Sequence, residues 1–176
     1  ASPETSQGTV IVTGASSGIG HAVCRRLTAA DRPIITVDIG EQPPDLAPEK
    51  HFICDLSSEE EIDAMVEVLS DDFDLQSIAA LVNVAGVPGT RPAAQVLDVN
   101  VLAVRYLSRC LVPHLSPGSS IVNVGSISGN GWQERLHMYQ SLLELDNADA
   151  RAWWSDRSKS VGVDPYTFSK EAVIVW

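Results

Sequence analysis

Tyr166 and Lys170, four residues apart in a stretch of helical composition, are the pair of side chains best suited to chemistry. Side chains at this spacing lie on one face of a helix, about 6 Å apart along its axis. A free phenol titrates at about pH 10, and a nearby ammonium favours its phenolate form. The pair could therefore act as a general acid and base. The alternative is an ordinary exposed helix face, because this spacing also occurs by chance.

A glycine-rich turn at residues 14–20 lies at the other end of the chain, between an apolar run at residues 9–13 and a helical stretch at residues 21–30. A buried strand, a glycine turn and a helix in this order can cradle a pyrophosphate, because glycine lets the backbone approach it and the helix N-terminus offers N–H groups. The alternative is a flexible turn without a ligand. The residues expected to contact a nucleotide here are Gly14, Ser16, Ser17, Gly18, Ile19 and Gly20.

Further apolar runs at residues 33–37, 51–54, 78–82 and 119–126 alternate with helical patterns, of which the longest covers residues 91–115. This alternation predicts an α/β fold, namely a Rossmann-type doubly wound parallel sheet with helices on both faces, in three α/β/α layers. Ser57 and Glu60 fit a capping box at the start of the helix that follows the third strand.

Asp38 ends the second predicted strand, 18 residues after Gly20. An acid at this point can accept hydrogen bonds from the adenosine ribose hydroxyls. Its carboxylate would repel a 2′-phosphate, and Ser16 and Ser17 add no basic side chain to the turn. These residues favour NAD over NADP as the cofactor, and the alternative is a solvated carboxylate at a strand end.

Thr13 followed by Gly14-x-x-x-Gly18-x-Gly20 resembles the nucleotide turn of the short-chain dehydrogenase/reductase family, and Tyr166-x-x-x-Lys170 resembles that family's catalytic signature. The resemblance implies that Lys170 holds the nicotinamide ribose hydroxyls, so Tyr166 and Lys170 would also contact the cofactor. It further implies cofactor contacts from residues at the ends of the third and fourth strands. These are Asp55 with Leu56, beside the adenine, and Asn83, Ala85 and Gly86, which keep three positions of an Asn-Asn-Ala-Gly motif that has Val84 second here.

The resemblance also implies two further catalytic residues. Ser126, after the fifth strand, would donate a hydrogen bond to the substrate oxygen, and Ser128 is a second candidate. Asn100, within the long helical pattern, would hold a water that links Lys170 to solvent. The alternative for Ser126 is a serine that hydrogen-bonds only to its own backbone at the strand end. The alternative for Asn100 is a place on an exposed helix face.

Residues 130–164 separate Ser126 from Tyr166 by far more than the family's usual spacing. Their apolar pattern predicts a helical insertion of two short helices. An insertion at this point resembles the bacterial 3α-hydroxysteroid dehydrogenase/carbonyl reductase subgroup. Its aromatic side chains could wall a pocket for a bulky apolar ketone or pack at a subunit interface, and we favour the interface with partial contact to the substrate.

Composition excludes several classes of partner. The 176 residues carry a formal net charge of −11, which argues against binding to nucleic acids or to anionic membranes. No apolar run reaches the roughly 18 residues of a membrane span. Cys24, Cys54 and Cys110 form no CxxC motif and no metal-ligand spacing with the four histidines, so we expect reduced thiols in a cytoplasmic protein and no metal.

Residues 1–176 are expected to form a single dinucleotide-binding domain that is incomplete at its C-terminus, because five strands alone would leave the fifth as an exposed edge. The expected function is NAD(H)-dependent interconversion of a secondary alcohol and a ketone, steroid-like or otherwise bulky and apolar, by a homodimer or homotetramer. Two alternatives stay open. One is a non-catalytic or truncated dinucleotide-binding regulatory relative, and the other is a methyltransferase, which has no use for Tyr166 and Lys170.

Overall fold

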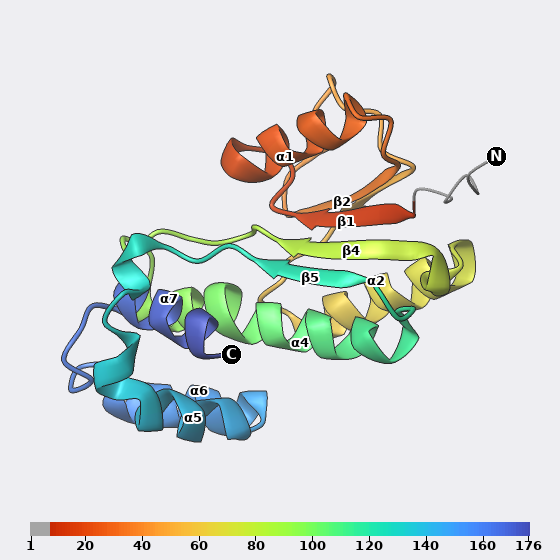
Figure 1. Cartoon of the computed structure of the whole chain (residues 1–176). Coiled ribbons are helices and arrows are strands. Elements are labelled where there is room, and N and C mark those ends of the chain that lie inside the picture. The colour runs from red at the N-terminus through yellow and green to blue at the C-terminus, as the bar shows by residue number, and fades with distance from the viewer. Residues whose placement is uncertain (1–7) are drawn as a thin grey trace. The chain divides into compact units, whose positions relative to one another are not determined.

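The computed structural model of the chain describes residues 8–176, which contain one five-stranded parallel sheet in the order β3-β2-β1-β4-β5 (Figure 1). After β3 the chain returns to the far side of β1, and this reversal defines a switch point between β1 and β4. The observed order confirms the predicted Rossmann-type α/β fold. The strands are β1 Thr9–Thr13, β2 Ile34–Asp38, β3 Lys50–Ile53, β4 Ile78–Asn83 and β5 Ser120–Asn123.

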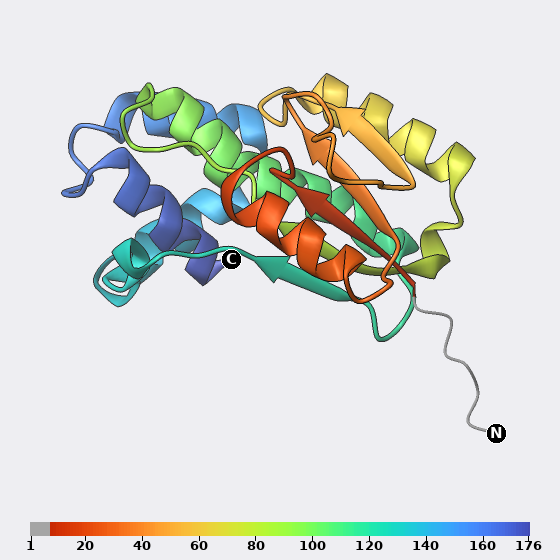
Figure 2. The ribbon, with the colours of Figure 1, turned by 90° about the horizontal axis from the view of Figure 1, so that it is seen from above.

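The chain divides into two compact units, which are described separately. Of the described residues, the first comprises 8–85 and 108–122, and it contains the sheet except for Asn123, the last residue of β5. Helix α1 (Gly18–Thr28) lies on one face of the sheet and α2 (Glu59–Asp72) on the other (Figure 1 and Figure 2). All five residues of β1 and the first four of β2 are buried, as expected for central parallel strands covered on both faces. Short 3₁₀ turns, η1 (Leu75–Ser77) and η3 (Val112–His114), precede β4 and β5.

The start of α2 differs from the predicted capping box. The cap is Ser58, whose hydroxyl accepts a hydrogen bond from the N–H of Glu61 at 3.2 Å. Ser57 is already engaged, because its N–H and its hydroxyl both donate to Asp55 Oδ1 at 2.9 and 2.7 Å. This local turn moves the helix start by one residue, so the predicted pairing of Ser57 with Glu60 is wrong.

The second unit comprises residues 86–107 and 123–176 and is mainly helical. The helix predicted over residues 91–115 is three consecutive pieces: α3 (Ala93–Leu97), a π-helical turn η2 (Asp98–Leu102) and α4 (Ala103–Leu111), which runs on into the first unit. After β5 come the 3₁₀ turns η4 (Ile127–Gly129) and η5 (Trp132–Arg135). They are followed by α5 (Leu136–Glu144), α6 (Asn147–Arg157) and α7 (Pro165–Val175). Helices α5 and α6 lie within residues 130–164, where the sequence predicts two short helices.

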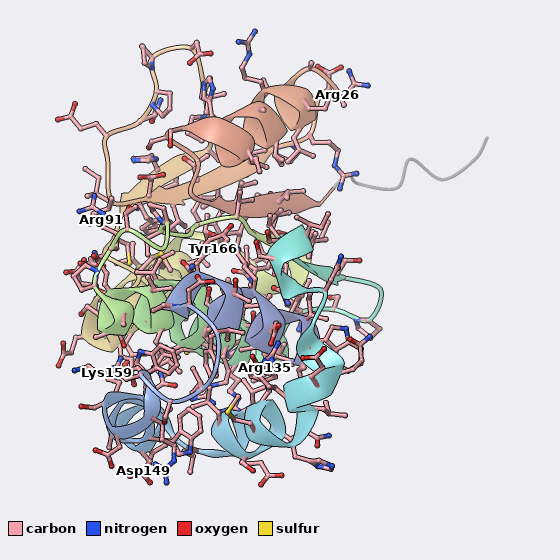
Figure 3. All side chains as sticks on the ribbon, turned by 90° about the vertical axis from the view of Figure 1, so that its left-hand side faces the viewer. Arg26, Arg91, Arg135, Asp149, Lys159 and Tyr166 are labelled. Carbon is pink, nitrogen blue, oxygen red and sulfur yellow. The ribbon has the colours of Figure 1, made fainter. Side chains whose placement is uncertain are left out.

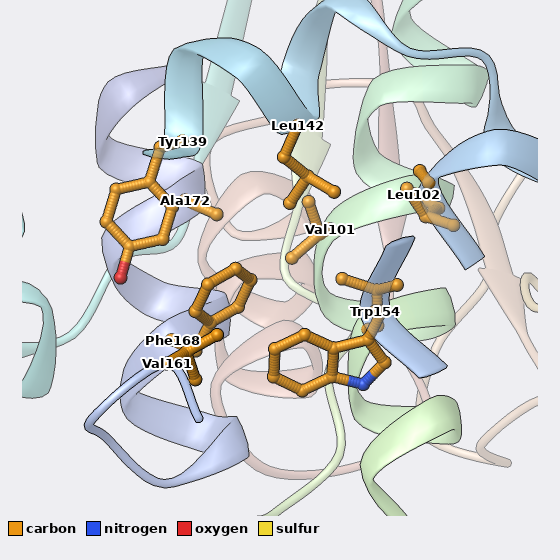
Figure 4. Packing of buried hydrophobic residues seen from close by; sticks show 10 residues of the cluster. Val101, Leu102, Tyr139, Leu142, Trp154, Val161, Phe168 and Ala172 are labelled. Carbon is orange, nitrogen blue, oxygen red and sulfur yellow. The ribbon is translucent and has the colours of Figure 1, made fainter. Parts of the chain in front are cut away.

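Phe168 of α7 lies in the middle of the core of the second unit (Figure 4). Its ring centroid is 4.4 Å from that of Trp154, 4.9 Å from that of Tyr139 and 6.1 Å from that of Trp153. Tyr139 and Trp154 are almost completely buried. These two aromatic side chains therefore belong to the unit's own core, and not to the subunit interface that the sequence suggested for them. No helix within residues 8–176 is both long and apolar enough to cross a membrane.

Candidate active site

The glycine turn between β1 and α1 doubles back so closely that side chains would not fit at two positions. At Gly14, which has a φ of +69°, an added Cβ would lie 2.8 Å from Ala85 Cα, and at Gly20 it would lie 2.0 Å from the Gly14 carbonyl oxygen. Helix α1 begins at Gly18, so the last residues of the motif form its first turn. This turn has no acidic side chain, and within the described residues the Ser17 side chain makes no capping hydrogen bond. Its N–H groups therefore suit a phosphate.

Asp38 at the end of β2 is fixed against the glycine turn. Its Oδ2 accepts a hydrogen bond from the N–H of Ser16 and its Oδ1 one from the N–H of Gly40, both at 2.9 Å. The Ser16 hydroxyl donates to the Glu41 carbonyl at 2.9 Å. The predicted ribose-binding carboxylate thus lies beside the predicted phosphate cradle, within the first unit.

His51 on β3, to which the sequence pattern gives no role, supports the segment after Asp38. Its Nε2 donates to the Gly40 carbonyl at 3.0 Å, and its Nδ1 lies 2.9 Å from the Thr36 hydroxyl. Because a carbonyl oxygen can only accept, Nε2 carries the proton. The register that pairs Thr36 with His51 creates this contact, and no short sequence motif records it.

The segment after β4 is joined to β1 through Thr13. The Thr13 hydroxyl accepts hydrogen bonds from the N–H groups of Val84 and Ala85, both at 3.1 Å. Asn83 is buried, and its amide donates to the Ser108 hydroxyl at 3.2 Å. Gly86, the last residue of the motif, is exposed and opens the second unit. Substituting Val84 for the usual second asparagine leaves the backbone contacts to Thr13 in place.

Helix α7 begins at Pro165 and carries Tyr166, labelled in Figure 3, and Lys170 in its first two turns. The Asp164 carboxylate caps the helix by accepting from the N–H groups of Tyr166 and Thr167 at 3.0 and 3.1 Å. Lys170 Nζ lies 5.8 Å from the centroid of the Tyr166 ring and donates to the Val124 carbonyl at 2.9 Å. Lys170 is 8% exposed, and this burial lowers its pKa from the usual value because the charged form loses water.

Asn100 lies in the π-helical turn η2 and is almost completely buried. Its Oδ1 accepts from the Val87 N–H at 2.8 Å, and its Nδ2 donates to the Val87 carbonyl at 3.0 Å and to the Ser169 hydroxyl at 3.1 Å. The Ser169 hydroxyl in turn donates to the Tyr166 carbonyl at 2.7 Å. Asn100 is therefore linked to α7 beside Lys170 and is not on an exposed helix face. Its role in holding a water stays a prediction.

Ser126 lies three residues beyond the end of β5, because that strand ends at Asn123 and not at the predicted residue 126. Its hydroxyl oxygen caps η4 by accepting from the Ser128 N–H at 3.2 Å, which leaves the hydroxyl proton to donate elsewhere. The turn then packs on α7, since a Cβ added to Gly129 would lie 2.9 Å from the Lys170 carbonyl oxygen. Asn100, Ser126, Tyr166 and Lys170 all belong to the second unit. Among residues 8–176 no group of three or more histidine, cysteine or acidic residues is placed to hold a metal ion.

Comparison with known proteins adds independent findings. The sequence profile of the short chain dehydrogenase family matches residues 8–141. The chain is 35% identical over 167 residues to coniferyl-alcohol dehydrogenase of Pseudomonas sp. strain HR199, covering 95% of this chain and 63% of that protein.

Solved structures with the same fold include two dehydrogenases. The 3-alpha-hydroxysteroid dehydrogenase from Pseudomonas sp. B-0831, complexed with NADH, superposes with a TM-score of 0.72 at 28% identity, covering 94% of this chain and 62% of that one. Aldohexose dehydrogenase from Thermoplasma acidophilum gives 0.67 at 26% identity, with 96% and 58% covered. The chain spans less than two thirds of the length of each of these three proteins.

Proposed function

Because this chain belongs to the short-chain dehydrogenase family, we propose that it is an NAD(H)-dependent oxidoreductase that interconverts a secondary alcohol and a ketone. One observation above all supports the proposal. The four residues that match the family's catalytic set lie within one compact unit, with Asn100 linked through Ser169 to the helix that carries Tyr166 and Lys170. Ser126 is on a turn that packs on the same helix.

The proposed mechanism assigns one task each to Tyr166, Lys170 and Ser126. Bound NAD would supply the hydride acceptor, carbon 4 of the nicotinamide ring. Tyr166 takes the proton of the substrate hydroxyl in oxidation and returns it in reduction. The ammonium of Lys170 stabilises the phenolate form of Tyr166, which accepts this proton in oxidation and is regenerated in reduction. Ser126 donates a hydrogen bond to the substrate oxygen, where negative charge develops.

NAD rather than NADP is the proposed cofactor, held by the glycine turn. The support is Asp38, whose carboxylate is fixed beside that turn and would repel a 2′-phosphate. The related hydroxysteroid dehydrogenase structure is complexed with NADH. The proposed contacts of Asp55, Leu56, Asn83, Ala85 and Gly86 with the dinucleotide follow from the family motif. One constraint is visible at Asp55, because its Oδ1 already accepts two hydrogen bonds from Ser57.

The proposed substrate is a bulky apolar alcohol or ketone, steroid-like or otherwise. The support is similarity to a protein named for a 3α-hydroxysteroid, which is a bulky secondary alcohol. The coniferyl alcohol in the name of another relative is also bulky and largely apolar, but it is a primary alcohol. From the same family membership we propose that the protein is a homodimer or homotetramer. We also propose that it is cytoplasmic, because its three cysteines are free thiols, as expected in a reducing compartment.

Titration and turnover together test the function. NADH binding is followed by the change in its fluorescence, and NAD reduction is followed by absorbance with coniferyl alcohol, a 3α-hydroxysteroid and cyclohexanol. We expect NADH to bind and at least one of the two secondary alcohols, the 3α-hydroxysteroid or cyclohexanol, to be oxidised. Oxidation of coniferyl alcohol alone would indicate a primary-alcohol dehydrogenase instead. Binding without turnover of any alcohol or ketone would indicate a non-catalytic dinucleotide-binding protein instead.

A further inference from the structure

The turn that carries Ser126 has little packing of its own. Ile127, the next residue, is 84% exposed, and Gly125 is exposed as well. The Ser126 side chain makes one local hydrogen bond, to the N–H of Ser128. A turn with so few buried side chains takes its position from the contacts on either side of it.

Before the turn, the Val124 carbonyl accepts the hydrogen bond from Lys170 Nζ. After it, Gly129 lies directly against α7, because an added Cβ would be 2.4 Å from Ile174 Cδ1. These two contacts tie the turn to the helix that carries Tyr166 and Lys170. Both are close to the catalytic residues themselves.

A third contact lies further along and involves residues to which the mechanism gives no role. Arg135, labelled in Figure 3, lies at the end of η5. It donates from Nε to Glu171 Oε2 at 2.8 Å and from Nη2 to Glu171 Oε1 at 2.7 Å. The Tyr139 hydroxyl donates to the same Oε2. Glu171 is 1% exposed and follows Lys170 directly in α7. Gly131 allows the backbone to approach, since a Cβ there would lie 2.8 Å from Glu171 Oε1.

The carboxylate of Glu171 is charged in this setting. Burial alone raises the pKa of a carboxyl group, but the hydrogen bonds from Arg135 and Tyr139 lower the pKa of Glu171 below its usual value. A bidentate arginine–carboxylate pair also fixes the relative orientation of the two side chains, because the guanidinium and the carboxylate are both planar. A buried pair of this kind is weak evidence of stability but can specify one arrangement of the elements it joins.

We propose that Arg135 and Glu171 are positioning residues, which fix the Ser126 turn in register with Tyr166 and Lys170. This inference rests on the proposed function. The segment from Val124 to Arg135 is held against α7 at both ends. Lys170 binds the Val124 carbonyl at its start, and Glu171 binds Arg135 at its end. A shift of about 1 Å in a catalytic group lowers rates on the order of 100-fold, so a modest loosening of the turn lowers turnover.

A double-mutant cycle tests the proposal. Arg135→Lys keeps the positive charge but cannot form both hydrogen bonds, and Ser126→Ala removes the group that the pair positions. We expect Arg135→Lys to lower kcat about tenfold in the native background, with KM nearly unchanged. In the Ser126→Ala background we expect Arg135→Lys to lower kcat less than about twofold, because Arg135 acts through the Ser126 hydroxyl, which is then already absent. If Arg135→Lys lowered kcat by the same factor in the native and the Ser126→Ala backgrounds, the proposal would be overturned and the ion pair would be merely structural.

Matched variants control for charge and for folding. Arg26→Lys changes an exposed arginine of α1 and Glu144→Gln an exposed glutamate of α5, and neither should alter kcat. Glu171→Gln is the second variant, should Arg135→Lys fail to fold, and it should lower kcat in the same selective way. NADH affinity should be unchanged in all four variants.

Amide hydrogen exchange gives a measure that does not depend on activity. In Arg135→Lys, exchange of residues 124–131 should accelerate about tenfold while exchange in α1 is unchanged. Unchanged exchange in residues 124–131 would overturn the inference even if the native protein proves inactive. An inactive native protein whose exchange responds as expected would contradict the proposed function alone.

Discussion

Replacing Phe168 by alanine should strongly destabilise the second unit of the protein. The Phe168 side chain is completely buried, and its ring lies within 4.4 to 6.1 Å of three other aromatic ring centroids. Removing a buried phenylalanine costs about 3–5 kcal/mol, and each aromatic pair adds about 0.5–1.5 kcal/mol beyond area burial. We therefore expect a loss near the top of the first range, about 4–5 kcal/mol, because the neighbouring rings cannot all close the cavity. Phe168→Leu, which fills most of the space, should lose about 2 kcal/mol.

Urea denaturation followed by tryptophan fluorescence measures this change in the relevant part of the chain. All four tryptophans, at positions 132, 153, 154 and 176, belong to the second unit. With a slope of about 2 kcal/mol per molar urea, the alanine variant should unfold at a midpoint about 2 M lower. Ile127→Ala is the control, because that side chain is 84% exposed and should change the free energy of unfolding by less than about 0.5 kcal/mol. A decrease of less than about 1 kcal/mol in the free energy of unfolding for Phe168→Ala would refute the conclusion that residues 136–157 pack around Phe168 of α7.

Three further predictions concern the nucleotide and the pH. Asp38→Ser should weaken NADH binding about tenfold and strengthen NADPH binding, as measured by fluorescence titration, and an unchanged ratio of the two affinities would contradict the role given to Asp38. Gly20→Ala should weaken NADH binding more than about tenfold, because the added Cβ would lie 2.0 Å from a backbone oxygen; near-native affinity with native circular dichroism would argue against the tight turn. Burial lowers the pKa of Lys170, so this side chain loses its charge at a pH below 10.5. As the pH rises, kcat should therefore fall before pH 10.5 is reached. A kcat that stays constant up to pH 10.5 would contradict this prediction.

The central strands and the tight glycine turn were predictable because their signals are local. β1 and β2 are continuous apolar runs, and the sequence after Thr13 contains both the glycine spacing and the helix start. Strand ends in a parallel sheet share an edge, so the place of Asp38 in the chain predicts that it lies beside the glycine turn.

Other features depend on contacts between distant residues and have no local signal. Arg135 and Glu171 are 36 positions apart, and nothing in either neighbourhood predicts that they meet. The apolar stripe of residues 91–115 is continuous, so the π-helical turn at Asn100 could not be read from its spacing. Ser57 and Glu60 satisfied the capping pattern, but the competing turn at Asp55 moved the cap to Ser58.

The most direct test of the account is the turnover of Tyr166→Phe, measured at saturating NAD together with its affinity for NADH. The substitution removes one hydroxyl from a half-buried side chain and leaves the cap of α7 unchanged, since that cap uses the backbone N–H of residue 166. We expect native NADH affinity and a kcat lower by about 100- to 10,000-fold. A kcat within about threefold of the native value would contradict the assignment of Tyr166 as the general acid and base.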